Sequence, residues 1–221
     1  MPTERASRRS VLLTFGLLGL GLAAIVGTTV ALLPGGPARP AMSVVGGPFR
    51  LQSSKGGVLD SATLVGKPYL VGFGFTQCPN VCPTVLADLT NLIEALHREG
   101  RDIGVYYVTV DPERDTVAVM RDYMASFSDR ITGLTGTPEE IGQVERAFRA
   151  EVRKVPLKDG DYTFEHTAML YLMDAAGRFV GPLDLAAGQD LALKQIRAVL
   201  RPGLAGRRAG ENRPRQQGPL A

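Results

Sequence analysis

The sequence predicts an α/β domain with a mixed central sheet, placed behind a single N-terminal transmembrane helix. Three observations lead to this prediction: an uncharged segment near the N-terminus, apolar strand candidates that alternate with amphipathic helix candidates, and two adjacent strand candidates late in the chain. Alternating strands and helices are typical of a sheet that is largely parallel. The adjacent late strands imply that part of the sheet is antiparallel.

The N-terminal segment predicts a membrane anchor. Residues 1–10 contain three arginines, and residues 11–33 contain no charged side chain. A helix of these 23 residues rises about 1.5 Å per residue and can cross about 30 Å of hydrocarbon. We therefore expect a basic cytoplasmic segment at 1–10, an anchor or uncleaved signal at 11–33, and a domain on the periplasmic or extracytoplasmic side of the cytoplasmic (inner) membrane. A cleaved signal, with its small-residue exit near Ala38, is the alternative, and the arginines also resemble a twin-arginine export motif.

The two ends of the chain carry its basic charge. Residues 34–47 are rich in Pro and Gly and predict a linker, residues 48–200 predict the domain, and residues 201–221 predict a disordered basic tail. The tail carries +4 and residues 1–10 carry +2, so the remaining residues carry −3 of the total +3. This balance argues against a nucleic-acid partner and leaves a weak attraction of the tail for anionic lipid or an acidic partner.

The elements of the domain follow from the periodicity of its apolar residues. A short hairpin is expected at 49–51 and 57–59, buried strands are expected at 69–75 and 103–110, and further strands are expected at 168–173 and 179–183. Helices are expected at 83–99, at 116–127, from Thr137 through Val152, and at 191–200. The third helix begins with a capping box and a proline at its first position. A polar loop, PLKDGDYTFE, is expected to connect this helix to the strand at 168–173.

The only two cysteines, Cys78 and Cys82, lie on the turn from the strand at 69–75 into the helix at 83–99. This placement is typical of a thioredoxin-like fold. Pro83 suits the first helical position, which would make Cys82 the N-cap and favour its thiolate through the helix dipole. With three residues between them, the two thiols could form a stabilising disulfide, exchange disulfides, or bind a soft ion such as Cu(I).

Two histidines could complete a metal site. His97 lies in the charged end of the first helix, where a solvated side chain is expected. His166 stands after the polar loop and directly before the strand at 168–173, whose end could lie beside the cysteine turn if that strand is central. By spacing alone, a surface role and a ligand role remain equally open for His166.

Three motifs resemble the Sco/SenC family of copper-binding, membrane-anchored assembly factors. They are FGFTQCPNVCPTVLADL, VTVDPERDT and FEHTAMLYLMDAAG, and they occur in this order within residues 45–200. The resemblance implies a thioredoxin-like fold and one copper ion, as Cu(I) and Cu(II), with Cys78, Cys82 and His166 as its metal ligands. It also marks Asp111 as a secondary residue that orients a ligand or docks a partner, with capping of the DPER turn as the alternative. Family members often have Asp where this chain has Asn80 and Glu165, two positions beside ligands.

The resemblance implies a metallochaperone rather than an enzyme. Its role would be to assist assembly of the binuclear copper site of cytochrome c oxidase, with the copper-bearing oxidase subunit and a second exported copper chaperone as partners. The alternative is a thiol-disulfide oxidoreductase that reduces the cysteines of the oxidase subunit or another exported partner, with Cys78 and Cys82 redox-active. Such enzymes usually have a cis-proline before the strand that faces the cysteines, and residues 163–173 contain no proline. A zinc site and a peroxidase with Arg114 or Arg121 as the activating neighbour are further alternatives.

Overall fold

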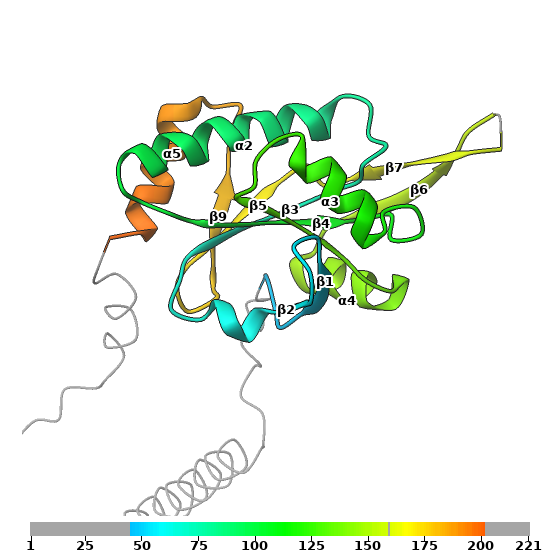
Figure 1. The fold of residues 1–221 in the computed structure, drawn as a ribbon, viewed down its shortest axis with the longest axis horizontal. Helices are drawn as coiled ribbons and strands as arrows, with labels where there is room; N and C mark the ends of the chain where they lie inside the picture. Colours follow the sequence, from blue (N-terminus) through cyan, green and yellow to red (C-terminus); the bar gives the residue numbers. More distant parts are fainter. Residues whose placement is uncertain (1–44, 159, 202–221) are drawn as a thin grey trace, which may run out of the picture. The chain divides into compact units, whose positions relative to one another are not determined.

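The computed structural model describes residues 45–158 and 160–201, which contain a mixed seven-stranded sheet in the order β2-β1-β5-β4-β3-β8-β9 (Figure 1). Strands β3, β4 and β5 are parallel, and the other neighbours pair in the antiparallel sense. The α/β class and the mixed sheet are therefore confirmed. The strands are β1 (Arg50–Ser53), β2 (Val58–Asp60), β3 (Tyr69–Gly74), β4 (Gly104–Thr109), β5 (Ile131–Thr135), β8 (Leu170–Met173) and β9 (Phe179–Leu183).

Helices cover both faces of this sheet. Apolar side chains of α2, α3 and α5 pack in one core cluster, and those of α4 pack in a second cluster on the opposite face (Figure 1). Strand β3 lies between them, and all six of its residues are buried, as its continuous apolar run predicts. The helices are α2 (Val81–Arg98), α3 (Val117–Ala125), α4 (Pro138–Phe148) and α5 (Gln189–Val199), with a short 3₁₀ turn, η1, at Ser61–Leu64.

Strand β5 was not expected from the sequence. It lies between β1 and β4 and is buried along its whole length, yet it has only five residues, ITGLT, and a glycine at its centre. A Cβ atom on Gly133 would lie 2.9 Å from the Met120 Cε atom and 3.1 Å from the Met124 Cγ atom. Close packing of α3 therefore requires glycine at this position. Glycine is unfavourable inside a strand, so it weakens the sequence pattern that would predict one.

The segment before His166 also differs from the prediction. Helix α4 ends at Phe148, and Arg149 adopts a left-handed conformation with φ of 56°. Val152 then begins strand β6 (Val152–Pro156), which pairs with β7 (Tyr162–His166) in a separate antiparallel ribbon. The expected helix through Val152 and the expected polar loop are both wrong here. The two strands pair with each other and none of their residues is buried, so they lack the apolar run that marks a core strand.

Several predictions at the ends of the chain lie outside the described residues: the basic segment at 1–10, the anchor at 11–33, the linker up to residue 44, and the basic tail apart from Arg201. Within 45–158 and 160–201, no helix combines the length and the apolar character needed to cross a membrane. The last residues of the expected linker lie against the domain, because the Gly46 N–H donates to the Ala147 carbonyl at 2.8 Å.

Candidate metal centre

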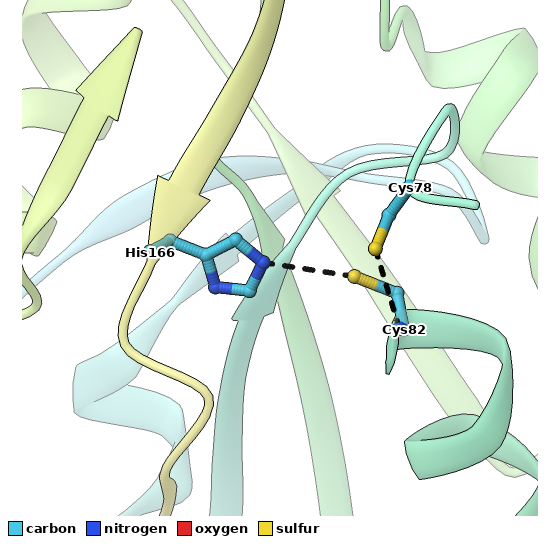
Figure 2. Close-up of side chains that lie close together, drawn as sticks. All are labelled: Cys78, Cys82 and His166. Atoms are coloured by element: carbon cyan, nitrogen blue, oxygen red, sulfur yellow. Dashed lines mark hydrogen bonds between the residues drawn. The ribbon is translucent and has the colours of Figure 1, made fainter. Parts of the chain in front are cut away.

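Cys78, Cys82 and His166 converge at the carboxyl end of β3 (Figure 2). Cys78 lies in the turn after the strand, Cys82 lies in the first turn of α2, and His166 is the last residue of β7. Strand β8 pairs directly with β3, and the short connection from β7 into β8 brings His166 to the cysteine turn. The expectation that His166 could reach the cysteines is therefore confirmed, since β8 is a central strand.

The three side chains have the geometry of a metal site. Their ligand atoms all lie within 4.8 Å of one another, and the Cys82 Sγ atom lies 3.7 Å from the His166 Nε2 atom. An ion bound at about 2.3 Å from sulfur and about 2.0 Å from nitrogen would separate those two atoms by about 3.5 to 4.3 Å, depending on the bond angle. The residues therefore fit a first-row metal ion with little rearrangement.

The His166 ring is oriented for a metal through its Nε2 atom. Its Nδ1 atom lies 3.1 Å from the Thr167 carbonyl oxygen, which can only accept a hydrogen bond. Nδ1 therefore carries the proton, and the Nε2 lone pair faces the sulfurs. The Phe75 ring packs edge-on against the imidazole, with centroids 5.9 Å apart. Backbone and packing together hold the ring in its ligand orientation.

The two sulfurs lie in different environments. Cys82 is the second residue of α2 and is buried, whereas Cys78 is half-buried in the turn. The Cys82 backbone N–H donates to the Cys78 sulfur at 3.4 Å (Figure 2). The prediction that Cys82 is the N-cap is therefore wrong: α2 begins two residues earlier than expected, Asn80 is the N-cap, and a free helix N–H points to Cys78.

The expected ionisation of Cys82 is also contradicted. Burial, followed by the hydrogen bond with Cys78, raises the pKa of Cys82 to about 12, although hydrogen bonds from Tyr107 and the Phe75 backbone act in the opposite direction. Without a metal, the Cys82 side chain is therefore a neutral thiol at neutral pH. Metal binding must displace its proton, so the affinity for a metal is expected to rise with pH.

Tyr107 and Gly74 lie directly behind Cys82, and neither was expected at the site. Tyr107, on β4, is only 2% exposed, and its hydroxyl lies near the Cys82 sulfur beside Gly74. A Cβ atom on Gly74 would lie 1.8 Å from the Tyr107 hydroxyl oxygen and 2.9 Å from the Cys82 Sγ atom. Only glycine leaves room for both groups at this position of β3.

We expect the substitution Gly74→Ala to destabilise the domain by about 3 kcal/mol, because overpacking of a filled core displaces neighbouring side chains. Urea unfolding of the metal-free protein measures this change. Gly181→Ala is the matched control, since a Cβ atom on that strand glycine would have no neighbour within 4 Å. Equal unfolding midpoints for the two variants would contradict the close approach of Tyr107 and Cys82.

Asp115 is a further residue that sequence reasoning missed. Its buried carboxylate accepts hydrogen bonds from the Thr76 N–H at 3.1 Å, the Thr76 hydroxyl at 2.5 Å and the Thr109 hydroxyl at 2.5 Å. Burial raises the pKa of Asp115 despite these bonds. Because Thr76 lies two residues before Cys78, the network attaches the start of the cysteine turn to the end of β4. In the sequence, the only feature that could have indicated Asp115 was its position at the end of the motif DPERD.

Asp111 does not hydrogen-bond the cysteines or His166. Its buried carboxylate accepts bonds from the Arg114 guanidinium and, at 3.1 Å, from the Tyr162 hydroxyl at the start of β7. Arg114 also stacks on the Tyr162 ring, 3.8 Å from its centroid, and donates to the Tyr162 carbonyl at 3.1 Å. These contacts connect the turn after β4 to the ribbon that carries His166.

Three other candidates from the sequence lie elsewhere. His97 is exposed at the end of α2, where it contacts Asp102 and the Arg130 guanidinium, as the solvated assignment predicts. Arg114 is bound to the ribbon, and Arg121 donates to the Ser54 carbonyl at 3.0 Å. Within the described residues, neither arginine has a recorded contact with a cysteine sulfur, so the geometry does not favour a peroxidase.

The fold and the three donors define a class: a thioredoxin-like protein with a candidate site for a soft metal ion. Residues 37–201 match the family model described as SCO1/SenC. The chain belongs to the SCO1/SenC family.

Two relatives illustrate the extent of the similarity. The SCO2-like protein RP587 of Rickettsia prowazekii is 37% identical over 69% of this chain and 73% of the relative. The mitochondrial protein SCO1 homolog 1 of Arabidopsis thaliana is 38% identical over 62% of this chain, but the matched part is only 42% of that relative. The similarity thus extends over most of this chain but over different shares of the two relatives.

Solved structures are similar over a comparable share of the chain. Bradyrhizobium japonicum ScoI with copper bound is 42% identical, has a TM-score of 0.66, and is matched over 70% of this chain and 99% of its own. BsSco, described as a member of the Sco family of cytochrome c oxidase assembly proteins with a disulfide switch, is 25% identical, with a TM-score of 0.60 and coverage of 72% and 94%. These structures confirm the thioredoxin-like fold.

Proposed function

We propose that this chain is a membrane-anchored copper metallochaperone. It binds one copper ion through Cys78, Cys82 and His166 and assists assembly of the binuclear copper site of cytochrome c oxidase. The observation that carries the proposal is the convergence of the three ligand atoms within 4.8 Å, in a family whose Bradyrhizobium member was solved with copper bound. Copper is the cargo of this activity, and the protein is not an enzyme in this role.

The donor set favours copper over zinc. Two thiolates bind Cu(I) strongly, and an imidazole makes Cu(II) acceptable as well, so one site can hold both oxidation states. His166 presents its lone pair from the end of a separate ribbon, whereas both cysteines belong to the β3–α2 connection. The imidazole can therefore be exchanged for a partner's ligand while the thiolates retain the ion.

The proposed location is the cytoplasmic (inner) membrane, with one transmembrane segment and the domain on its periplasmic or extracytoplasmic side. The uncharged residues 11–33 behind a basic N-terminus support this location. The proposed partners are the copper-bearing subunit of the oxidase, which receives the ion, and a second exported copper chaperone, which supplies it. The description of BsSco as an oxidase assembly family member supports the first partner.

Asp111 is proposed to position His166 by holding the ribbon through Arg114 and Tyr162. We expect Asp111→Asn to lower the affinity for Cu(II) by about tenfold, since loss of such outer contacts typically weakens metal binding 10- to 100-fold. Affinity for Cu(I), which depends chiefly on the thiolates, should change much less. Competition titrations measure both affinities, and hydrogen exchange of the ribbon should accelerate in the variant.

Asp102→Asn is the matched control for Asp111→Asn, because Asp102 also pairs with an arginine, Arg130, but lies beside His97 rather than the metal centre. Identical Cu(II) affinities in the two variants would contradict the positioning role. A loss of binding to the oxidase subunit with copper affinities unchanged would assign Asp111 to partner docking instead.

A second candidate function is thiol-disulfide exchange with an exported partner. Both thiols are free in this structure, and the half-buried Cys78 sulfur lies at the N-terminus of α2 above the buried Cys82. This asymmetry suits an attacking thiol followed by a resolving thiol: Cys78 forms a mixed disulfide with the partner, and Cys82 then displaces the reduced partner, leaving a Cys78–Cys82 disulfide.

The metal content of the full-length protein, purified in detergent with its thiols reduced, tests the proposed function. We expect one copper ion per chain and a Cu(I) affinity that excess zinc does not overcome. A reduced protein that retains no copper would reject the metallochaperone and leave the oxidoreductase. Retention of zinc in preference to copper would reject copper as the cargo.

A further inference from the structure

Asp115 places a fully buried carboxylate beside the ends of two central strands. Its side chain is 0% exposed, and within the described residues it has no recorded salt bridge to a basic side chain. Its two oxygens accept instead from neutral donors on Thr76, two residues after the end of β3, and on Thr109, the last residue of β4. A buried charge is unfavourable unless hydrogen bonds compensate for the lost water. The carboxylate therefore holds the two strand ends together.

On one side, the hydrogen bonds of Asp115 lead to the cysteine turn. The Thr76 N–H donates to the carboxylate at 3.1 Å and the Thr76 hydroxyl donates at 2.5 Å. Hydrogen bonds to an ionised acceptor are roughly twice as strong as those between neutral groups. Two residues further on, the Cys78 N–H donates to the Phe75 carbonyl at 3.3 Å, so the turn is short and tightly closed. The position of the Cys78 sulfur therefore depends on where Thr76 is held.

On the other side, the hydrogen bonds of Asp115 lead to the ribbon. The Thr109 hydroxyl donates to Asp115 at 2.5 Å and accepts from the Asp111 N–H at 2.9 Å. The Asp115 N–H donates to the Asp111 carbonyl at 2.8 Å, so the Asp111 backbone is held at both of its polar groups. The Asp111 carboxylate in turn accepts from the Tyr162 hydroxyl at the start of β7, the strand that ends at His166. A continuous series of hydrogen bonds thus connects Asp115 to the ribbon.

We propose that Asp115 is a positioning residue that holds both halves of the metal centre, the cysteine turn and the ribbon that carries His166, in one arrangement. The inference rests on the proposed function, because copper is the ion whose ligands are positioned. The recorded hydrogen bonds of Asp115 go to Thr76, Thr109 and Asp111 rather than to a ligand, so it acts through these residues. Ligands that are already in place bind an ion more tightly, because no free energy is spent on arranging them.

The substitution Thr76→Val tests the branch that leads to the cysteines. In the full-length protein it keeps the shape of the side chain and the backbone N–H, but it leaves one oxygen of the buried carboxylate without its hydroxyl donor. We expect the Cu(I) affinity to fall about tenfold, as is typical when an outer contact of a metal site is lost. Thr76→Ser keeps the hydroxyl and should bind Cu(I) nearly as tightly as the wild type. Equal losses in the two variants, or no loss in either, would overturn the inference.

The substitution Asp115→Asn tests both branches together. It keeps the size of the side chain but removes the charge and replaces one acceptor oxygen by a donor. We expect the affinities for Cu(I) and for Cu(II) both to fall about tenfold, since both halves of the centre are released. Asp111→Asn, which releases only the ribbon, should lower chiefly the affinity for Cu(II). Competition titrations of the folded variants measure these affinities, and a loss confined to Cu(II) in Asp115→Asn would overturn the inference.

Asp174→Asn is the matched control for Asp115→Asn. The Asp174 carboxylate also accepts from backbone N–H groups in a turn after a central strand, those of Ala176 at 2.9 Å and Arg178 at 3.0 Å. This turn follows Met173, which pairs with the first residue of β3, so it lies at the end of the sheet away from the cysteines. Its copper affinities should equal those of the wild type. Equal affinities in the two variants would overturn the positioning role while the proposed function stood.

Hydrogen exchange of the metal-free reduced protein gives a readout that does not depend on copper. The Thr76 amide should exchange slowly in the wild type, because the buried carboxylate accepts its hydrogen bond. Asp115→Asn should accelerate exchange by about tenfold or more in both the cysteine turn and the ribbon, and Thr76→Val should do so in the turn alone. A Thr76 amide that exchanges in the wild type as fast as an unprotected peptide would overturn the inference, even if the variants failed to fold. A wild type that retained no copper would instead reject the proposed function.

Discussion

Replacing either cysteine by serine should lower the affinity of the reduced protein for Cu(I) by more than about 100-fold, beyond the effect typical of outer-shell residues. Serine keeps the size of the side chain but offers a hydroxyl, which is a hard donor and stays protonated, so it cannot replace a thiolate toward Cu(I). The effect is expected for both Cys78→Ser and Cys82→Ser, because their sulfurs lie in one group with the imidazole. Competition titration with a chromogenic Cu(I) chelator measures the loss.

Val81→Ser is the control for these two variants. It introduces a serine into the same first turn of α2, at an exposed residue, and leaves both sulfurs in place. Its Cu(I) affinity should equal that of the wild type. Thermal unfolding of each variant confirms that the domain remains folded. A Cys82→Ser variant that kept its copper would remove the buried sulfur from the ligand set and would leave the assignment of the site without support.

His166→Ala should abolish retention of Cu(II), and it should weaken Cu(I) binding by about tenfold or more while changing disulfide exchange by less than about threefold. The reason is that the imidazole is the nitrogen donor that makes Cu(II) acceptable, whereas thiol exchange requires only the two sulfurs. Copper retention is measured after gel filtration in each oxidation state. Exchange is measured as the rate at which the reduced protein reduces a small disulfide.

His97→Ala provides the matched control for His166→Ala, because it removes the other histidine of the chain, which lies exposed at the end of α2. It should leave copper retention and thiol exchange unchanged. Equal loss of copper binding and thiol exchange in His166→Ala would show that the two activities cannot be separated at this histidine. Retention of Cu(II) by His166→Ala would identify a different nitrogen or oxygen ligand.

The sequence predicted the elements that have strong local signals. The continuous apolar run of β3, the capping box of α4 and the helical spacing of Leu86, Leu89 and Ile93 all act within a few residues of the chain. Strand β5 and the ribbon of β6 and β7 were missed for the opposite reason. In β5, the close packing of α3 requires a glycine at position 133, and this glycine weakens the local strand pattern. The strands of the ribbon pair with each other rather than with the core, so they have no continuous apolar run.

The sequence predicted the three residues that converge here but not their surroundings. Cys78 and Cys82 are four residues apart, so the sequence alone places them together. Tyr107 gives no such signal, because a tyrosine in an apolar strand is an ordinary feature, and the only signal for Asp115 is its place at the end of DPERD, far from the cysteines in the sequence. They become part of the centre only through the pairing of β4 with β3, which aligns the ends of the two strands.

By itself, the sequence determined the donor types and the order of most elements, because the spacing of the cysteines and the periodicity of apolar residues are local properties. Only the tertiary structure decided that His166, 84 residues after Cys82, faces the sulfurs, since the pairing of β8 with β3 brings the two segments together. The tertiary structure also decided that Cys82 is a neutral thiol when no metal is bound. Burial outweighs the helix N-terminus, and the amount of burial depends on the packing of the whole domain.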